Sequence, residues 1–65
     1  MTEVFEEFSM DFTSRSQYAK RDDGVWFKRR QYRDPRYGYK WSKWEATSFG
    51  PKNAIGMTMR IRLPK

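Results

Sequence analysis

The most regular pattern of apolar and polar positions lies at the C-terminal end of the chain. Residues 57–63, Met-Thr-Met-Arg-Ile-Arg-Leu, alternate apolar and polar without interruption. A period of two is typical of a half-buried β-strand. We therefore predict a strand whose apolar side chains face the core, namely Met57, Met59, Ile61 and Leu63. Its polar residues, Thr58, Arg60 and Arg62, should face outward, and Pro64 should end the pairing.

The N-terminal part shows a shorter version of the same pattern. Residues 7–12, Glu-Phe-Ser-Met-Asp-Phe, predict a strand with Phe8, Met10 and Phe12 facing inward. A helix is the alternative, because Val4, Phe8 and Phe12 also share one helical face. Phe and Ser are weak helix formers, so we prefer the strand.

Turn-forming residues divide the middle of the chain into further strands. Asp23-Gly24 before Val25-Trp-Phe predicts a hairpin with a type I′ turn, followed by a strand over 25–33. Asp34-Pro35 predicts a type I turn, after which Gly38 can close the loop and 39–46 can form the return strand. Residues 48–56 are rich in Gly, Pro and Asn and are expected to form a loop.

A loop over 34–38 fixes the pairing of this second hairpin. Its expected opposite pairs are Arg33 with Tyr39, Tyr32 with Lys40, Arg30 with Ser42, and Lys28 with Trp44. One face would then carry Trp26, Lys28, Arg30, Tyr32, Lys40, Ser42 and Trp44. The other would carry Val25, Phe27, Arg29, Gln31, Arg33, Tyr39, Trp41 and Lys43. A single bulge would exchange the faces beyond it.

These elements predict an all-β domain over residues 1–65. We expect a small, strongly bent antiparallel sheet of four to five strands with a projecting basic hairpin, or the same strands closed into a small barrel. A chain of 65 residues buries only a thin core, and the sequence has no Cys for a disulfide. A homodimer is one way to add buried surface.

Charge is unevenly distributed along the chain. The net charge is +6, yet residues 1–14 hold four acids and no base, so all 14 Lys and Arg residues lie in the remainder. The acidic segment can pair with basic strands inside one sheet. Alternatively, it can compete with nucleic acid for the basic surface.

Cationic and aromatic side chains are concentrated in the same segment. Nine of the 14 Lys and Arg residues and eight of the 12 aromatic residues fall within residues 18–44. Cations can follow phosphates while rings stack on bases, which is what a site for single-stranded DNA or RNA requires. The candidate nucleic-acid-binding residues are Trp26, Lys28, Arg29, Arg30, Tyr32, Arg33, Arg36, Lys40, Lys43, Trp44, Arg60 and Arg62.

The same residues allow other interpretations. The basic segment 29–36 could enter the major groove of a duplex as a β-ribbon, or could be a solubilising loop. The tryptophans could belong to the core. Aromatic residues and Arg also dominate protein interfaces, so a small interaction module or inhibitor that docks on an acidic protein surface is the alternative function.

Catalysis, metal binding and membrane insertion have little support in the sequence. The chain has no His and no Cys, no Gly-rich phosphate loop and no apolar run long enough to span a membrane. Asp22 and Asp23 are explained by a turn. We expect a non-enzymatic protein without a cofactor. The acidic N-terminus is unlike a signal peptide, so we expect a cytoplasmic location.

Overall fold

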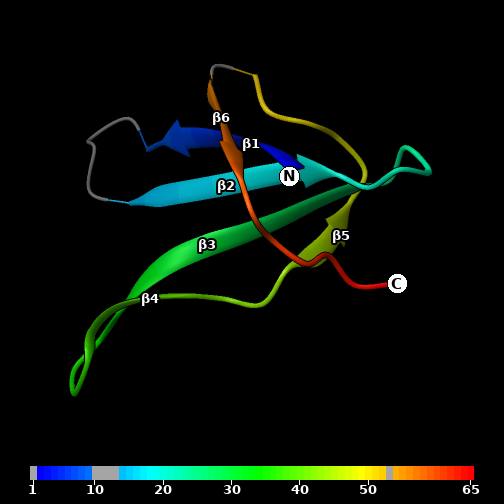
Figure 1. Cartoon of the computed structure of the whole chain (residues 1–65). Helices are drawn as coiled ribbons and strands as arrows, with labels where there is room; N and C mark the ends of the chain where they lie inside the picture. Colours follow the sequence, from blue (N-terminus) through cyan, green and yellow to red (C-terminus); the bar gives the residue numbers. More distant parts are fainter. Residues whose placement is uncertain (1, 10–13, 53) are drawn as a thin grey trace.

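The computed structural model describes residues 2–9, 14–52 and 54–65, and these form six strands and no helix (Figure 1). The strands are β1 (Thr2–Phe8), β2 (Arg15–Lys20), β3 (Trp26–Asp34), β4 (Gly38–Trp41), β5 (Glu45–Thr47) and β6 (Ile55–Met59). All pairs are antiparallel, in the order β4-β3-β2-β1-β6, and β5 also pairs with β3. The predicted all-β fold is confirmed, with six strands instead of four or five. The sheet is open among the described residues, so the barrel alternative is not formed.

The first strand begins earlier than the alternation predicted. It ends at Phe8, whose side chain is 41% exposed, so the inward orientation predicted for Phe8 is wrong. Val4 is fully buried instead, because it pairs with Ala19 of β2 and Met57 of β6 in the middle of the sheet. Met10 and Phe12, the other two residues of that prediction, lie outside the described residues.

The C-terminal strand also begins and ends earlier than the alternation predicted. β6 starts at Ile55 and ends at Met59, so the predicted strand to Leu63 is too long. Exposure still alternates as far as Leu63, with the apolar residues half-buried and the polar residues exposed. Beyond Met59 the chain leaves the sheet edge and reaches the turn after β2, where Arg21 Nη1 donates a hydrogen bond to the Pro64 carbonyl at 2.7 Å.

The hairpin at Asp23-Gly24 is confirmed, but its loop differs from the predicted type I′ turn. The Arg21 N–H donates to the Val25 carbonyl and the Gly24 N–H to the Arg21 carbonyl, both at 2.8 Å. Gly24 has φ = +91°, so this is a three-residue loop that ends in a left-handed glycine. A side-chain hydrogen bond from Arg21, with a second from the Val25 N–H, lowers the pKa of Asp23 to about 2.

At its tip the second hairpin has the predicted loop and register. Arg33 pairs with Tyr39 and Tyr32 with Lys40, and Gly38 closes the loop with φ = +80°. The Asp34 carboxylate accepts hydrogen bonds from the two following turn N–H groups, which fixes the loop. The tip projects from the body of the sheet, as expected, and the protein measures 36 × 24 × 21 Å along its principal axes (Figure 1).

A bulge interrupts this hairpin between β4 and β5. Lys28 pairs with Glu45 rather than with Trp44, so the return strand contains one more residue than the predicted register allows. At the bulge the Ser42 N–H still donates to the Arg30 carbonyl, but the Arg30 N–H donates to the Ser42 hydroxyl. The hydroxyl satisfies a backbone donor while the backbone turns away. Trp44 therefore leaves the face on which it was predicted.

The sheet has a small apolar cluster on each face. We call the face of the even-numbered β3 residues the even face, and the other the odd face. On the odd face Val4, Ala19 and Phe27 are buried side by side across three strands. On the even face the rings of Phe5 and Trp26 are 5.9 Å apart, next to buried Tyr18.

Candidate functional site

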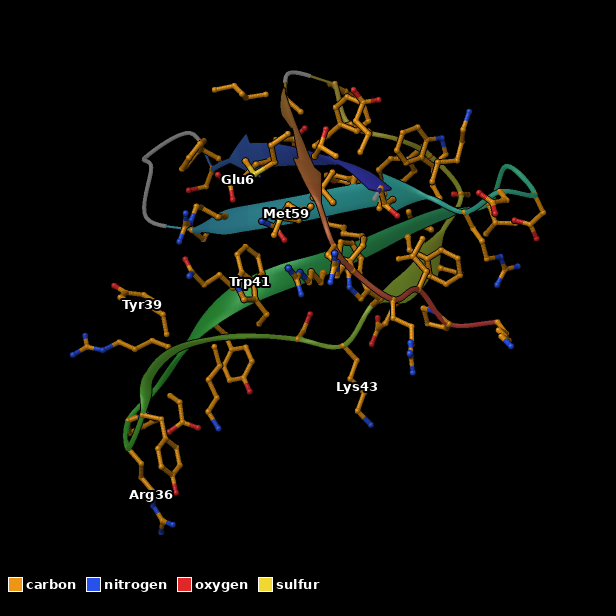
Figure 2. All side chains as sticks on the ribbon, in the orientation of Figure 1. Glu6, Arg36, Tyr39, Trp41, Lys43 and Met59 are labelled. Carbon is orange, nitrogen blue, oxygen red and sulfur yellow. The ribbon has the colours of Figure 1, made fainter. Side chains whose placement is uncertain are left out.

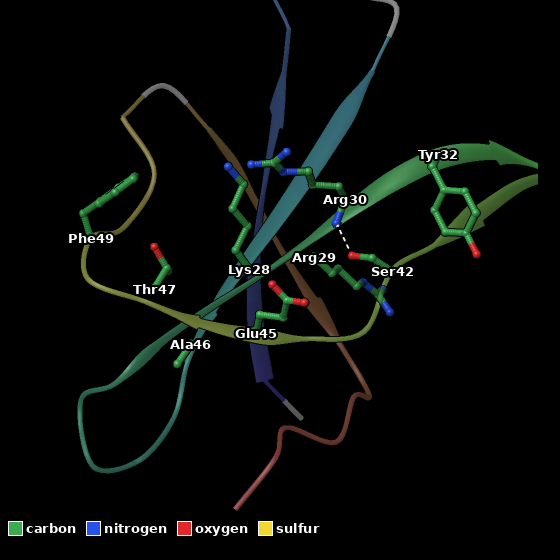
Figure 3. Close-up of a pocket in the computed structure, with 9 residues that line it drawn as sticks. All are labelled: Lys28, Arg29, Arg30, Tyr32, Ser42, Glu45, Ala46, Thr47 and Phe49. Atoms are coloured by element: carbon green, nitrogen blue, oxygen red, sulfur yellow. Dashed lines mark hydrogen bonds between the residues drawn. The ribbon is translucent and has the colours of Figure 1, made fainter.

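An open hollow of ≈ 530 Å³ lies on the even face, between β3 and the segment from β5 to Phe49 (Figure 3). Alternate residues of β3 point to this face because side chains in a strand alternate between the two faces. The β-bulge places β5 on the opposite wall. The lining residues are Lys28, Arg29, Arg30, Tyr32, Ser42, Glu45, Ala46, Thr47 and Phe49.

The hollow has two cations on the even face, Lys28 and Arg30, and neither forms an ion pair with a described acid. In the described part of the chain the ion pairs are Arg15–Glu6 at 3.7 Å and Arg21–Asp23 at 2.7 Å, so neither hollow cation is involved. The Lys28 ammonium lies 5.2 Å from the centre of the buried Tyr18 ring. This contact holds the stem of Lys28 against the sheet and leaves its charge available to an anion.

Two aromatic rings flank the hollow and are open to solvent. Tyr32 is 47% exposed and Phe49 is 58% exposed. Tyr32 was among the predicted site residues. Phe49 was assigned only to a loop, and its apolar character within a Gly-Pro segment was the one available signal.

Trp26 was predicted to stack on a ligand, but other residues cover it. It lies at the start of β3, half-buried against Phe5. The segment after β5 passes so close that a Cβ atom on Gly50 would lie 2.8 Å from Trp26 Cε2. Lys20 also lies over this ring, 5.8 Å from its centroid. Trp26 therefore belongs to the packing of the even face rather than to its open surface.

The basic surface continues along the projecting hairpin. Lys40 lies opposite Tyr32 on the even face, with its ammonium 4.3 Å from the centre of the Tyr37 ring. The predicted site residues Arg33 and Arg36 are exposed. Arg36 and Lys43 point away from the sheet into solvent, whereas Trp41 points back over β3 (Figure 2). The tip thus offers cations at several orientations.

Arg29 and Trp44, two other predicted site residues, meet on the odd face. The Arg29 guanidinium lies between two indole rings, 4.8 Å from the centre of Trp41 and 4.6 Å from that of Trp44. Its Nε donates to Gln17 Oε1 at 2.8 Å, and Gln17 Nε2 donates to Glu6 Oε1 at 3.0 Å. Burial lowers the pKa of Arg29 from its usual value. This chain of contacts across β1, β2 and β3 stabilises the sheet and holds the Arg29 guanidinium on the odd face, although Arg29 is also among the residues that line the hollow.

The last two predicted site residues, Arg60 and Arg62, lie beyond β6, at the opposite end of the strand order from β4. Both are exposed. Arg62 lines a separate hollow together with Lys20 and Arg21, near the turn after β2. The structure therefore does not bring these arginines to the hollow between β3 and β5.

Comparison with protein-family models, with curated proteins and with solved structures gives no match. Within the described residues, no helix is long and apolar enough to cross a membrane.

Proposed function

We propose that this protein binds single-stranded DNA or RNA on its even face, without catalysis. The observation that carries the proposal is the hollow itself, which is lined by the exposed ring of Tyr32 and by Lys28 and Arg30, two cations that form no ion pair with any described residue. Phosphates would contact the two cations and Lys40, and a base would stack on Tyr32. Such stacking contributes roughly 1–3 kcal/mol per base.

The position of the rings favours single strands over duplexes. A base must be unstacked from its neighbours before an aromatic side chain can cover its flat face. Tyr32 and Phe49 lie at the walls of an open hollow, where an unpaired base can reach them. A duplex would offer only its phosphates to the same cations.

Two tyrosines on neighbouring strands provide a matched test. Tyr32 of β3 and Tyr39 of β4 are both exposed, at 47% and 66%, but they occupy opposite faces of the hairpin. We expect Tyr32→Ala to weaken binding of a labelled single-stranded oligonucleotide by roughly 1–3 kcal/mol in fluorescence anisotropy. Tyr39→Ala should leave the affinity nearly unchanged.

Charge variants complete this experiment. Lys28→Ala and Arg30→Ala should each reduce the slope of log K against log salt by about 0.7, because one fewer phosphate is neutralised. Lys65→Ala, at the far end of the chain, is the control. The proposal would be contradicted if Tyr32→Ala and Tyr39→Ala lowered the affinity equally, or if no oligonucleotide bound at about 150 mM salt.

The tip of the hairpin supports a second candidate, an acidic protein surface as partner. Arg33, Arg36 and the strongly exposed rings of Tyr37 (69%) and Tyr39 (66%) are residue types that dominate protein interfaces. Competition with a polyglutamate peptide separates the two functions, because this polyanion has charge but no bases. If it displaces the oligonucleotide at equal charge concentration, attraction between charges alone explains binding.

A further inference from the structure

One residue of the hollow has the wrong charge for a phosphate site. Glu45 lies on β5 directly opposite Lys28, and its carboxylate points into the hollow (Figure 3). Its side chain forms no ion pair or hydrogen bond with any other described residue. By contrast Asp34, the acid at the tip of the same hairpin, is occupied by two turn N–H groups. Glu45 therefore keeps its full capacity to accept hydrogen bonds.

A carboxylate in this position disfavours phosphate but can accept hydrogen bonds from a base. Cytosine presents an exocyclic amino group as a donor, whereas uracil and thymine present a carbonyl oxygen at the same ring position. In the hollow the carboxylate of Glu45 lies between the rings of Tyr32 and Phe49, and the head groups of Lys28 and Arg30 lie to one side (Figure 3). A nucleotide whose phosphate contacts these cations can direct its base edge to Glu45.

We infer that the hollow selects a base that carries an exocyclic amino group, and that it prefers cytosine to uracil. Glu45 accepts the hydrogen bond from the amino group, and Tyr32 covers the face of the base. The inference rests on the proposed function and adds base selection to it. The purely structural alternative is that Glu45 only balances the charge of Lys28 across the two strands.

The test compares two pyrimidine homo-oligonucleotides of equal length, deoxycytidine and deoxyuridine, near neutral pH. The protein should bind the cytosine strand roughly tenfold more tightly, within the range of a single base-edge contact. Glu45→Gln should abolish this preference. Glu3→Gln is the matched control, because it makes the same change at an exposed position of β1 outside the hollow and should keep the preference.

A ligand-side variant tests the same hydrogen bond without altering the protein. Oligonucleotides of N4,N4-dimethyldeoxycytidine lack the donor and should bind like deoxyuridine. Equal binding of cytosine and uracil strands would overturn the inference and leave the proposed function intact. So would a Glu45→Gln variant that binds both strands more tightly by the same factor, since Glu45 would then only repel phosphate. If neither strand binds, the proposed function fails as well.

Discussion

At the scale of single residues, the buried amide of Gln17 links three strands. Gln17 is only 3% exposed, and it joins Glu6 of β1 to Arg29 of β3 through two hydrogen bonds. Arg29 in turn lies between Trp41 and Trp44, where each cation–π contact contributes roughly 0.5–2 kcal/mol. The amide thus directs the guanidinium to the position where both rings can contact it.

We expect Gln17→Leu to lower the free energy of unfolding by roughly 1–3 kcal/mol, because Arg29 Nε and a Glu6 oxygen lose a partner in a partly buried site. Urea denaturation followed by circular dichroism measures the change. Gln31→Leu is the matched control, since Gln31 accepts from Arg15, whose side chain is 40% exposed. It should cost less than about 1 kcal/mol. Equal losses would show that Gln17 has no special role.

At the scale of elements, the segment that follows β5 packs against Trp26 on the even face. It approaches Trp26 at Gly50, where a Cβ atom would lie 2.8 Å from ring carbon Cε2. The ring cannot simply move aside, because it packs on Phe5 and lies under Lys20. The segment therefore depends on having no side chain at this position.

Gly50→Ala should destabilise the fold by roughly 1–3 kcal/mol through overpacking. The near-ultraviolet circular dichroism of the tryptophans should change at the same time, because the segment must move away from Trp26. Gly56→Ala serves for comparison. Its Cβ would lie 3.2 Å from Phe5 Cε1, a contact that a small shift relieves, so we expect a smaller loss. A Gly50→Ala protein as stable as the parent would contradict this account of the packing.

At the scale of the whole molecule, stability depends on the last residues of the chain. After β6 the apolar side chains of Ile61 and Leu63 remain half-buried, and Pro64 is held by Arg21. A domain of this size has about 3–5 kcal/mol of stability, and one buried aliphatic side chain contributes roughly 1.5–3 kcal/mol of that.

Ile61→Asp should therefore leave a largely unfolded chain by circular dichroism, because it removes apolar burial and places a charge in its position. Arg62→Asp tests the neighbouring, exposed position with the same introduced residue. It should retain a cooperative thermal transition. Retention of that transition in Ile61→Asp would show that the end of the chain contributes little to folding.

The residues that could be predicted from sequence are those whose structure is locally determined. Asp34-Pro35 and Gly38 fix their turn by short-range hydrogen bonds and backbone preference, so the pairing at the tip was predicted correctly. The bulge could not be predicted, because the Ser42 hydroxyl replaces a carbonyl only once the two strands have met. The error then passed to Trp44, whose side chain lies on the face opposite to the predicted one.

The covering of Trp26 by the segment after β5 could not be predicted for the same reason. It depends on a contact with Gly50, 24 residues away in sequence, and no local pattern encodes such a contact. Four residues of the candidate site were correctly placed on one face, namely Lys28, Arg30, Tyr32 and Lys40. The bulge lies in the return strand after β4, so it does not change the orientation of the β3 residues or of Lys40 near the tip. Glu45 and Phe49 were missed, since their position depends on how β5 returns to β3.

The interruption at Ser42 also has a consequence for motion. β2 pairs with residues 26–30 of β3, and β4 pairs with residues 31–34, so among the described residues the outer part of the hairpin is a two-stranded ribbon. Such a ribbon is only marginally stable by itself and can open locally while the rest of the sheet stays folded. The proposed nucleic-acid-binding surface would therefore have a stiff half at Lys28 and Arg30 and a compliant half at Tyr32 and Lys40. If the proposed function holds, ordering the compliant half on binding costs conformational entropy, and in return the hairpin can adapt to nucleic-acid ligands of different shape.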